Sequence, residues 1–470
     1  MRIGFVLLWA CFSLLAQAQQ VPAAVTEMLN KNKVAAEDVS IWVQGIEAEQ
    51  PLVDLNGKQP RHPASVAKVL TTASGLIRLG ADFRWETKFY VDSLPDANGV
   101  VDGNLYVVGG GDPFLVEEQL LAMLQGLQQA GVRHITGDIV LDDSLYHLSP
   151  QERDAAAFDG KPWAAYNAVP HPLMVNFRTV KMQVTPQAGK PKLALVPEIV
   201  NWKIDNQLQV RKGNCSGDGF TPSAVLERDD KGYAVMHVAG TYATGCGAQD
   251  VMLVLGEASE QFYYLFRDLW YRLGGSFDGA GKVAKTPSTA KHIYTGLSEP
   301  LAVQIQRMNQ ESNNVMTRQL MLTLGAKTFD PPGSLEKGRN AVRMTLEAFG
   351  INTDGMIIDN GAGLSRLELT SAEQLAQLLR YIYLSDQGQT FLQSLAVAGE
   401  SGTLRKRYRG EALAGRVIGK TGTIDNVRSF AGYVRAESGR NYVVVVIGNG
   451  KSAVRSRAMQ DDLFRWLYQQ

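Results

Sequence analysis

The chain has no excess charge and very little cysteine, and both facts narrow the functions to consider. Its 470 residues include 47 Lys and Arg, 47 Asp and Glu, and only three Cys. A balanced charge lacks the basic footprint typical of proteins that bind nucleic acids or anionic membranes. We therefore expect no nucleic-acid partner. No low-complexity tract or clear repeat is present, and a chain of this length and 45% hydrophobic content predicts two or three domains.

Several catalytic signatures are absent as well. The six His form no His-Glu-x-x-His pattern, which argues against a zinc hydrolase. No Gly-x-Ser-x-Gly elbow of an α/β-hydrolase is found. The run Gly109-Gly-Gly-Asp112 lacks the lysine of a phosphate loop and the spacing of a dinucleotide fingerprint, so we interpret it as a turn. We expect neither a metal ion nor a cofactor.

What the chain does contain is three short motifs in one order along the sequence. They are Ser65-Val-Ala-Lys68, Ser312-Asn-Asn314 and Lys420-Thr-Gly422. Ser-x-x-Lys also occurs at Ser288–Lys291 and Ser334–Lys337, so this pattern is not specific by itself. Only the occurrence at Ser65 opens a predicted helix upstream of the other two motifs, which makes it the candidate.

The first motif suits a nucleophile and its base. A serine hydroxyl is a weak nucleophile and needs a neighbouring base. Pro63 favours a helix start, and Ser65 and Lys68 then lie on one helical face, about one turn apart. Lys68 is a base only as a neutral amine, which burial and a nearby cation such as Lys420 would favour. Read alone, the motif would fit a plain helix start with a solvated lysine; the other two motifs argue against that alternative.

The other two motifs suit proton transfer and substrate binding. Ser312 can relay a proton to a leaving group, and Asn314 can hydrogen-bond a substrate amide. Lys420 and Thr421 suit a terminal carboxylate, and Gly422 would let a substrate backbone approach closely. The alternatives are a polar helix cap for the second motif and an edge strand with a turn for the third.

Taken together, the ordered motifs resemble the serine penicillin-recognising enzymes. From Ser65 to Ser312 the chain runs 247 residues (312 − 65), and from Ser312 to Lys420 it runs 108 (420 − 312). Class A β-lactamases place the first two motifs far closer, so this chain must hold an inserted domain. The pattern resembles the class C low-molecular-mass penicillin-binding proteins, the D-Ala-D-Ala carboxypeptidase/endopeptidases of peptidase family S13.

Further segments resemble the same family, so that the resemblance covers nearly the whole mature chain. They are Tyr106–Pro113, Gly137–Asp143, Asn360–Arg366 and Glu400–Leu404. The chain also departs from the family at two places. Thr317-Arg318 stands where Ala-Glu is expected, and Asn360-Gly-Ala362 replaces Asp-Gly-Ser. Neither departure touches the candidate catalytic groups.

The resemblance implies the fold, since the pattern alone gives only the α+β class. It implies a β-lactamase/transpeptidase-like catalytic domain, in which helices flank a five-stranded antiparallel sheet. Strands and Gly/Asp turns dominate residues 84–286, and helices return afterwards. We therefore expect a strand-rich insertion at 84–286 and a catalytic domain in two parts, 19–83 and 287–470.

The resemblance also implies a reaction, acyl transfer from peptidoglycan stem peptides. Ser65 would attack the D-Ala-D-Ala carbonyl and Lys68 would accept its proton. Ser312 and Lys420 would return a proton to the departing D-Ala, and Asn314 would hold the amide on the acyl side. β-Lactams would acylate the same serine.

The third motif would bind the other end of the substrate. Lys420, Thr421 and Thr423 would hold its carboxylate, with Gly422 allowing close approach. The backbone N–H groups of Ser65 and Thr423 would form the oxyanion hole. Removal of the terminal D-Ala is carboxypeptidase action, whereas cutting a cross-link is endopeptidase action, and the sequence leaves their balance open.

Two rival functions share these motifs, a β-lactamase and a non-catalytic module that senses β-lactams or binds the wall. Class A β-lactamases use a glutamate in a Glu-x-x-x-Asn pattern between the second and third motifs to drive water onto the acyl group. Glu336 has Asn340 four residues on, but its surroundings predict a helix start rather than a loop over the serine. We therefore expect a long-lived penicilloyl-enzyme.

Other specificity candidates carry less support. The resemblance places Arg366 at the rim of the active site, where it could pair with a carboxylate on the third residue of the stem peptide; the alternative is a surface arginine. Asp142-Asp143 ends a predicted strand, and we favour a turn there over the lining of a substrate cleft.

The ends of the chain and its cysteines indicate an exported protein. Residues 1–18 have one positive charge, an apolar run and Ala16-Gln-Ala18, which predicts a signal peptide cut before Gln19 and export to the periplasm. Of the remaining cysteines, Cys215 and Cys246, an even pair in an oxidising compartment favours a disulfide. The C-terminal segment predicts a packed amphipathic helix rather than a membrane anchor, so we expect no integral membrane span. The oligomeric state is left open.

Overall fold

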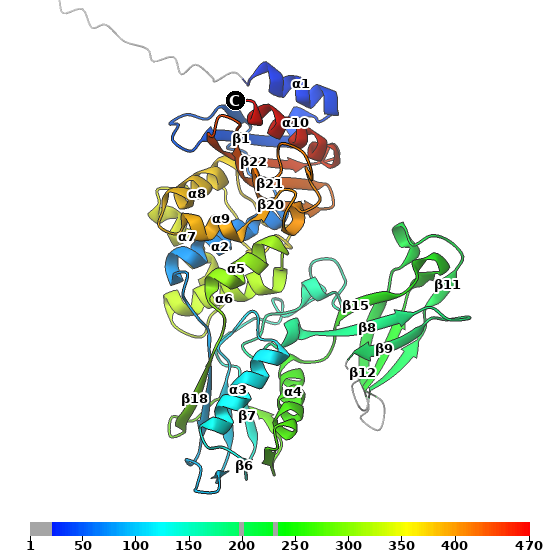
Figure 1. Ribbon diagram of the computed structural model, residues 1–470, viewed down its shortest axis with the longest axis vertical. Helices are drawn as coiled ribbons and strands as arrows, with labels where there is room; N and C mark the ends of the chain where they lie inside the picture. Colours follow the sequence, from blue (N-terminus) through cyan, green and yellow to red (C-terminus); the bar gives the residue numbers. More distant parts are fainter. Residues whose placement is uncertain (1–20, 197–201, 229–233) are drawn as a thin grey trace, which may run out of the picture.

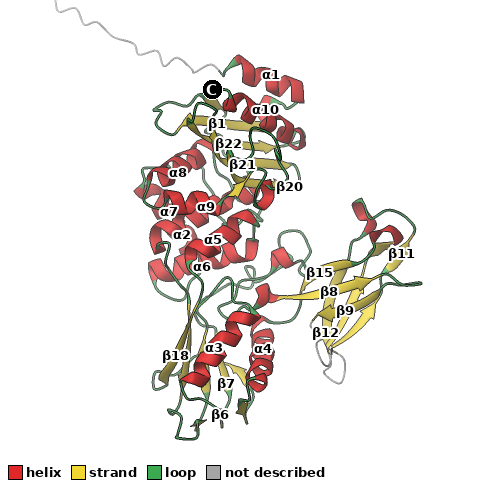
Figure 2. Cartoon of the chain, viewed as in Figure 1, coloured by secondary structure: helices red, strands yellow, loops and turns green. Residues whose placement is uncertain are grey.

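Three bodies of structure can be distinguished in the computed structural model, which describes residues 21–196, 202–228 and 234–470. Figure 1 shows an upper body that contains both ends of the described chain, a lower body beneath it, and an arm at the side. The predicted signal peptide lies outside the described residues. Helices concentrate in the upper body and strands in the arm (Figure 2).

The upper body is built on a six-stranded antiparallel sheet to which both ends of the chain contribute. Residues 39–55 form a hairpin, and the apolar run at 441–447 lies in a strand that is paired on both sides. The expected number of strands was five, and the difference arises from very short strands at the two edges. In sheet order the strands are β19 (Ala396–Val397), β20 (Val417–Ile424), β21 (Val427–Arg435), β22 (Asn441–Asn449), β1 (Val39–Gly45) and β2 (Val53–Leu55).

Both faces of this sheet are covered, which explains the continuous apolar sequence of β22. Successive side chains of a strand point to opposite faces. Val444 and Val446 pack in one core with helices α1 (Ala23–Asn32) and α10 (Ser456–Tyr468). Val443, Val445 and Ile447 pack in a second core on the other face. The predicted C-terminal amphipathic helix is α10, which buries Leu463, Phe464 and Leu467.

The second core is helical and carries the first two motifs. Its central helix is α2 (Lys68–Leu79), which ends at Gly80, because a glycine tolerates the positive φ of +83° there. The helices around α2 are mostly apolar toward it. They are α5 (Leu301–Gln310), α6 (Asn314–Phe329), α7 (Leu335–Ala348), α8 (Ala372–Leu384) and α9 (Gly388–Ser394).

The lower body is a mixed five-stranded sheet covered by helices α3 (Glu117–Gln129) and α4 (Ala258–Arg272). Its last strand, β18, pairs with β3 beyond the expected boundary at 286. We therefore propose the division of the chain predicted from the sequence, with the end of the insertion moved from residue 286 to Leu297. In sheet order its strands are β17 (Gly281–Val283), β7 (Ile139–Asp142), β5 (Leu105–Val108), β3 (Glu86–Val91) and β18 (Lys291–Leu297). A small parallel sheet beside it joins β16 (Ser276–Phe277), β6 (His134–Ile135) and β4 (Val100–Val101).

The arm has its own small core and the disulfide. Cys215 and Cys246 are bonded, which confirms the predicted pair over two separate thiols. The arm stands apart from the two larger bodies in Figure 1. Its strands are β8 (Thr179–Thr185), β9 (Lys192–Val196), β10 (Trp202–Asn206), β11 (Gln209–Arg211), β12 (Ser223–Arg228), β13 (Ala234–Ala239), β14 (Thr241–Ala243) and β15 (Gln249–Val254).

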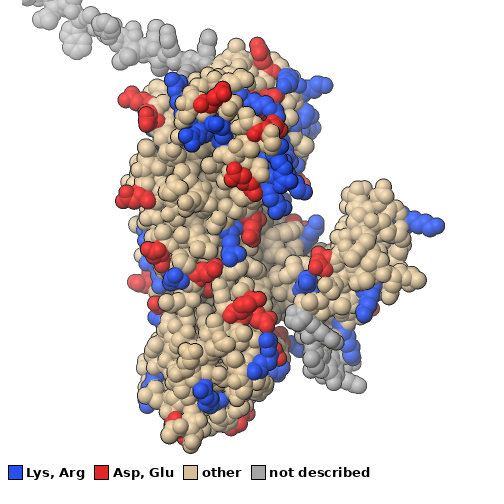
Figure 3. All heavy atoms as spheres, viewed as in Figure 1, with Lys and Arg blue, Asp and Glu red and all other residues tan. Residues whose placement is uncertain are grey.

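The surface reflects the balanced composition of the chain. Acidic and basic side chains are interspersed over most of the visible face, with one basic concentration at the edge of the upper body that faces the arm (Figure 3). Among the described residues, no helix is both long enough and apolar enough to cross a membrane.

Candidate functional site

Ser65 lies in a single 3-10 turn, Ala64–Ala67, that leads directly into α2. The preceding Ala64 has a φ of +49°, an uncommon conformation for a residue with a side chain. Strain of this kind, on the order of 1–3 kcal/mol, persists where the surroundings fix the backbone. Here the Ala64 N–H donates to His62 Nδ1 at 3.0 Å, and the Ser429 hydroxyl donates to the Pro63 carbonyl at 2.5 Å. The turn that presents Ser65 is therefore held from both sides.

Two glycines allow neighbouring backbones to approach this turn. A Cβ on Gly363, whose φ is +80°, would overlap the Ala64 carbonyl oxygen. A Cβ on Gly422 would overlap the Ser429 hydroxyl and the Pro63 carbonyl. The sequence assigned Gly422 to the approach of a substrate, whereas the approach seen is that of β20 to the Ser65 turn.

Lys68 is completely buried, and its amine faces Ser65. Its Nζ lies 3.1 Å from Ser65 Oγ, 2.6 Å from Asn314 Oδ1 and 2.5 Å from the Ala362 carbonyl oxygen. Burial, with the nearby charge of Lys420, holds the Lys68 pKa well below its usual range. A neutral amine has two N–H groups and one lone pair. The two carbonyl oxygens accept the N–H groups, which leaves the lone pair for the Ser65 hydroxyl.

Lys420 is also completely buried, and burial lowers its pKa to about 7. Its Nζ donates to Ser312 Oγ at 2.9 Å and to the Thr421 carbonyl oxygen at 3.0 Å. Ser312 itself adopts a φ of +59° just before α6. The second and third motifs thus meet through a lysine–serine pair, as Ser65 and Lys68 do within the first.

The second motif also contains a helix cap, but neither candidate residue provides it. Asn313 caps α6 by accepting the Met316 N–H at 3.0 Å. Ser312 on one side of the cap faces Lys420, and Asn314 on the other faces Lys68. Of these three consecutive residues, the middle one caps the helix and the two outer ones face the buried lysines.

A cavity of about 420 Å³ opens over these groups. It is lined by Ser65, Ser312, Thr421, Gly422 and Thr423 together with residues from α10 and the segment after 402. The Thr421 hydroxyl donates to Thr403 Oγ1 at 2.9 Å. The structure therefore brings residues of all three motifs together around one cavity. The buried amines of Lys68 and Lys420 contact two of its lining residues, Ser65 and Ser312.

Glu368 is a buried carboxylate behind Lys68, and the sequence reasoning assigned it no role. Its Oε1 accepts the Gly361 N–H at 2.7 Å, and this loop presents the Ala362 carbonyl to Lys68. Burial, with the charge of Asp359, raises the Glu368 pKa to about 7. A buried acid is rarely unpaired, but only the fold shows which lysine it approaches. Glu368 thus has two effects: it holds the loop at Gly361 through a hydrogen bond, and its negative charge raises the Lys68 pKa.

We expect the Glu368→Gln substitution to shift the pH dependence of acylation. The negative charge of Glu368 raises the Lys68 pKa, so its removal lowers that pKa and the neutral amine persists to lower pH. The glutamine oxygen can still accept the Gly361 N–H. The acidic limb of the penicillin acylation rate, followed by stopped-flow fluorescence, should therefore move to lower pH with the alkaline plateau kept. An unmoved limb would show that Glu368 acts only on the loop.

Arg366 does not line the cavity. It is exposed, donates to the Leu364 carbonyl at 2.8 Å, and lies near enough to Tyr166 for its charge to oppose the raised pKa of that phenol. Tyr166 belongs to the insertion. Arg366 therefore lies near the insertion, and its charge also acts on His62 beside the Ser65 turn.

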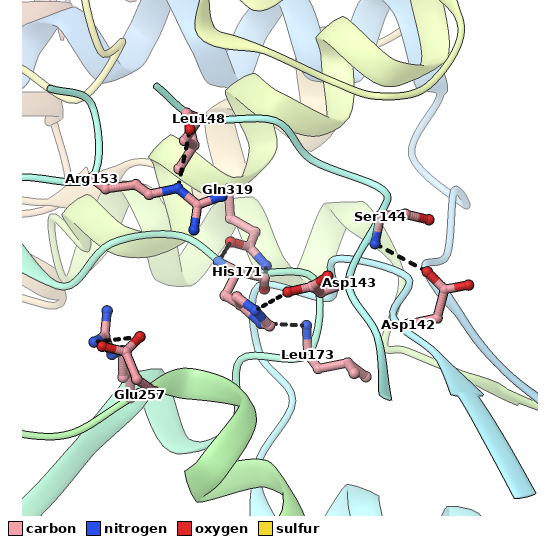
Figure 4. Close-up of polar contacts among 10 residues, drawn as sticks. Asp142, Asp143, Ser144, Leu148, Arg153, His171, Leu173, Glu257 and Gln319 are labelled. Atoms are coloured by element: carbon pink, nitrogen blue, oxygen red, sulfur yellow. Dashed lines mark hydrogen bonds and ion pairs between the residues drawn. The ribbon is translucent and has the colours of Figure 1, made fainter. Parts of the chain in front are cut away.

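Asp142 forms the predicted turn, whereas Asp143 lines a cavity. Asp142 ends β7 and accepts the N–H groups of Ser144 and Thr286, which makes a turn as favoured. Asp143 lines a second cavity of about 340 Å³, where it contacts His171 at 3.2 Å. Figure 4 shows this pair beside Gln319 of α6.

The charges of the second cavity are partly paired with one another. Arg178 approaches Glu257 at 3.8 Å, and Arg153 donates to the Leu148 carbonyl (Figure 4). The cavity that Asp143 lines is separate from the one that contains Ser65.

Glu336 is not positioned to take part in deacylation. It is exposed in the first turn of α7, which Ser334 caps by accepting the Lys337 N–H at 3.2 Å. The predicted helix start is confirmed, and Glu336 does not line the cavity that contains Ser65.

Both departures from the family pattern have structural roles. Arg318 is buried in α6 and donates to the Ala168 carbonyl at 3.0 Å, which ties the helix to the insertion. Asn360 accepts the Ala362 N–H at 2.9 Å through its side chain. It thereby orients the Ala362 carbonyl, which accepts from Lys68 Nζ at 2.5 Å. The expectation that neither departure touches a candidate catalytic group is therefore wrong for Ala362.

Comparison with known proteins matches this chain to one family. The D-Ala-D-Ala carboxypeptidase 3 (S13) family matches residues 21–470. The chain is 28% identical over 432 residues to a D-alanyl-D-alanine carboxypeptidase of Actinomadura sp. strain R39, covering 88% of this chain and 78% of the relative. It is 24% identical to one from Haemophilus influenzae, covering 96% and 92%.

A solved structure has the same fold over almost the whole chain. Penicillin-binding protein 4 of Haemophilus influenzae superposes with a TM-score of 0.81 at 23% identity, covering 95% of this chain and 99% of that one. The expected β-lactamase/transpeptidase-like fold with an insertion is thus confirmed. Since the family match spans nearly every described residue, the chain belongs to the D-Ala-D-Ala carboxypeptidase 3 (S13) family.

Proposed function

We propose that the protein is a serine-type D-Ala-D-Ala carboxypeptidase that acts on peptidoglycan stem peptides and is acylated by β-lactams. The observation that carries this proposal is the contact of the buried Lys68 amine with Ser65 Oγ at 3.1 Å. A dry amine with a lowered pKa is a base at neutral pH. The curated relatives in the same family are named for this activity.

Acylation begins at Ser65. Its Oγ attacks the carbonyl carbon of the penultimate D-Ala as its proton passes to Lys68 Nζ, and Asn314 orients the amide on the acyl side. When the intermediate collapses, the C–N bond breaks and the departing nitrogen takes a proton from Ser312, which Lys420 Nζ contacts at 2.9 Å. The products of this step are an ester on Ser65 and free D-Ala.

The oxyanion hole follows from the edge of β20. The short strand β19 pairs only with Ile418 and Gly419, so the part of β20 that follows borders the Ser65 turn instead. The backbone N–H groups of Ser65 and Thr423 are proposed to hold the oxyanion, a contribution of about 10²–10³-fold per donor in other acyl-transfer enzymes. The hydroxyls of Thr421 and Thr423 with the Lys420 amine are proposed to hold the substrate carboxylate.

Deacylation should distinguish peptide from penicillin. After peptide cleavage the D-Ala diffuses away and opens the site to water, whereas the ring nitrogen of penicillin stays attached and shields the ester. Neither Glu336 nor another carboxylate lines the described cavity to drive water onto it. We expect a penicilloyl-Ser65 adduct that persists through the time of many peptide turnovers, measured by intact-mass spectrometry alongside D-Ala release. Rapid catalytic loss of penicillin absorbance would indicate a β-lactamase instead.

Arg366 is proposed to select the third residue of the stem peptide. Its exposed guanidinium lies near Tyr166 of the insertion. We propose that it faces the acyl side of the site, where a carboxylate could form a charge-assisted pair with it. We expect Arg366→Ala to lower kcat/KM about tenfold for peptides with diaminopimelate at position three relative to those with lysine. An unchanged ratio of the two, measured by D-Ala release, would leave Arg366 as a surface residue.

The cellular location is proposed on the same basis. The predicted signal peptide at 1–18 would carry the protein to the periplasm, where its substrate lies. A change in apparent mass corresponding to cleavage before Gln19, followed in fractionated cells, tests this part of the proposal.

A further inference from the structure

His62 is a buried histidine that directly precedes the Ser65 turn, and its side chain does not line the cavity that contains Ser65. Both of its ring nitrogens have a backbone partner. Nδ1 lies 3.0 Å from the Ala64 nitrogen, and Nε2 lies 2.5 Å from the carbonyl oxygen of Ser365, which is 303 positions away in the sequence. The ring therefore links the turn that presents Ser65 to the loop that follows Asn360.

These two partners determine which ring nitrogen carries the hydrogen. A backbone N–H can only donate, so Nδ1 accepts from Ala64, and a carbonyl oxygen can only accept, so Nε2 donates to Ser365. One neutral tautomer satisfies both contacts, whereas a protonated ring would set two N–H groups against each other at Ala64. Burial lowers the pKa of His62, and the charge of Arg366 lowers it further, which favours the neutral ring.

The backbone of His62 is fixed as well as its ring. Asn449 Oδ1 accepts the His62 N–H at 2.8 Å, and Asn449 Nδ2 donates to the His62 carbonyl at 3.0 Å. Asn449 is the last residue of β22, a strand of the six-stranded sheet. His62 is thus anchored to the sheet, and its ring extends from that anchor to the two segments that it links.

A second His-Pro pair shows what the local turn does by itself. His171 Nδ1 accepts the Leu173 N–H at 3.2 Å across the intervening proline, as His62 Nδ1 accepts the Ala64 N–H (Figure 4). Leu173 does not have a positive φ, whereas Ala64 has a φ of +49°. The His-Pro turn therefore does not require a strained residue, and the conformation of Ala64 depends on the contacts around it, His62 Nδ1 among them.

The loop on the other side of the ring directs the Lys68 amine. The Ala362 carbonyl oxygen lies 2.5 Å from Lys68 Nζ and accepts one of its N–H groups. Further along, the same loop is held by the contact of Ser365 with His62. A shift of this loop relative to the turn would rotate the amine and direct its lone pair away from the Ser65 hydroxyl.

We propose that His62 is a positioning residue for acylation, because its neutral ring links the Ser65 turn to the loop that directs the Lys68 amine and so keeps Ser65 Oγ aligned with the lone pair that takes its proton. The inference rests on the proposed function, in which Lys68 is the base. His62 contacts no reacting atom and acts through the backbone of its two partners. A misplacement of about 1 Å can lower a reaction rate by about 10²-fold, so the expected effect is large.

The test separates the rate of acylation from the binding of penicillin. We expect His62→Ala to lower the acylation rate constant by about 10²-fold. The dissociation constant of the noncovalent penicillin complex should stay as in the wild type, because His62 does not line the cavity. Both constants come from stopped-flow measurements over a range of penicillin concentrations, and circular dichroism checks that the fold is retained.

Two conservative variants each keep one contact of the ring, so the test does not depend on the folding of His62→Ala. The side-chain oxygen of His62→Asn can accept the N–H of Ala64, since asparagine commonly bonds the backbone two residues on, but it is too short to reach Ser365. The longer amide of His62→Gln can donate to Ser365 but leaves Ala64 without its acceptor. We expect each to acylate about tenfold more slowly than the wild type. Wild-type acylation by both would contradict the proposal.

The matched control is His171→Ala. This substitution removes the same His-Pro turn contact and a second ring contact, with Asp143 at 3.2 Å, in the second cavity. It should acylate as the wild type does. An equal loss in this variant, or a loss in His62→Ala that is confined to the dissociation constant, would contradict the role of His62.

The wild type separates this inference from the proposed function. Absence of penicillin acylation in the wild type would overturn the proposed function, and the role of His62 with it. Normal acylation by the wild type, with the same rate constant in His62→Ala, would overturn the role of His62 alone.

Discussion

Ser65→Ala is expected to abolish both penicillin labelling and D-Ala release. The substitution removes the proposed nucleophile, whose Oγ lies in the cavity 3.1 Å from the buried amine of Lys68. Without an acyl-enzyme the residual rate comes from binding and oxyanion contacts alone, so a loss of roughly 10⁴-fold or more is expected. Fluorescent penicillin followed by gel imaging, with D-Ala release measured in parallel, checks the result.

The other two Ser-x-x-Lys serines provide matched controls. Ser288 is exposed in a loop, and Ser334 caps α7. Neither lines the cavity. Ser288→Ala and Ser334→Ala should both be labelled as the wild type is. A penicilloyl adduct located on either serine by peptide mass spectrometry would contradict the assignment of Ser65.

Lys68→Gln is expected to reduce the acylation rate by about 10²–10⁴-fold, the usual contribution of a positioned general base. A glutamine amide can still donate to the carbonyl oxygens that Lys68 contacts, of Asn314 and Ala362, but it cannot take the proton of Ser65. The loss should therefore appear in the rate of covalent bond formation, measured with penicillin by stopped flow, with the fold retained by circular dichroism.

Lys337→Gln is the control for this variant. Lys337 occupies the same place in its Ser-x-x-Lys pattern, but its Nζ donates to the exposed carbonyls of Asp330 and Pro332. It should acylate at the wild-type rate. If Lys68→Gln acylates as fast as Lys337→Gln, the base must be another group, and the Lys420–Ser312 pair would be the next candidate.

Sequence reasoning located the parts of the site that depend on short-range order. The helix start after Pro63, the spacing of Ser65 and Lys68 and the C-terminal amphipathic helix are local features, which periodicity and turn chemistry predict. The convergence of the three motifs on one cavity also agrees with the resemblance to the family.

Features that depend on contacts between distant residues were not predictable in this way. Glu368 was one glutamate among several between the second and third motifs, and only the fold places it behind Lys68. The cavity that contains Ser65 is also lined by Arg407, Arg428 and Arg457, which come from three separate segments with no common sequence pattern. Arg318 departs from the family pattern, and its contact with the insertion appears only once α6 is packed.

The sheet described for the upper body has a consequence for how the protein reaches its native state. Strand β1 pairs along its length with β22, so that Val39 lies opposite Gly448. Closing so long a loop is slow, because the chain loses conformational entropy before the paired strands make stabilising contacts. The insertion can order early, whereas β1 can pair with β22 only after β22 has been synthesised. A nascent or truncated chain that lacks β22 leaves β1 without its partner, so the sheet that carries Lys420 on β20 is incomplete.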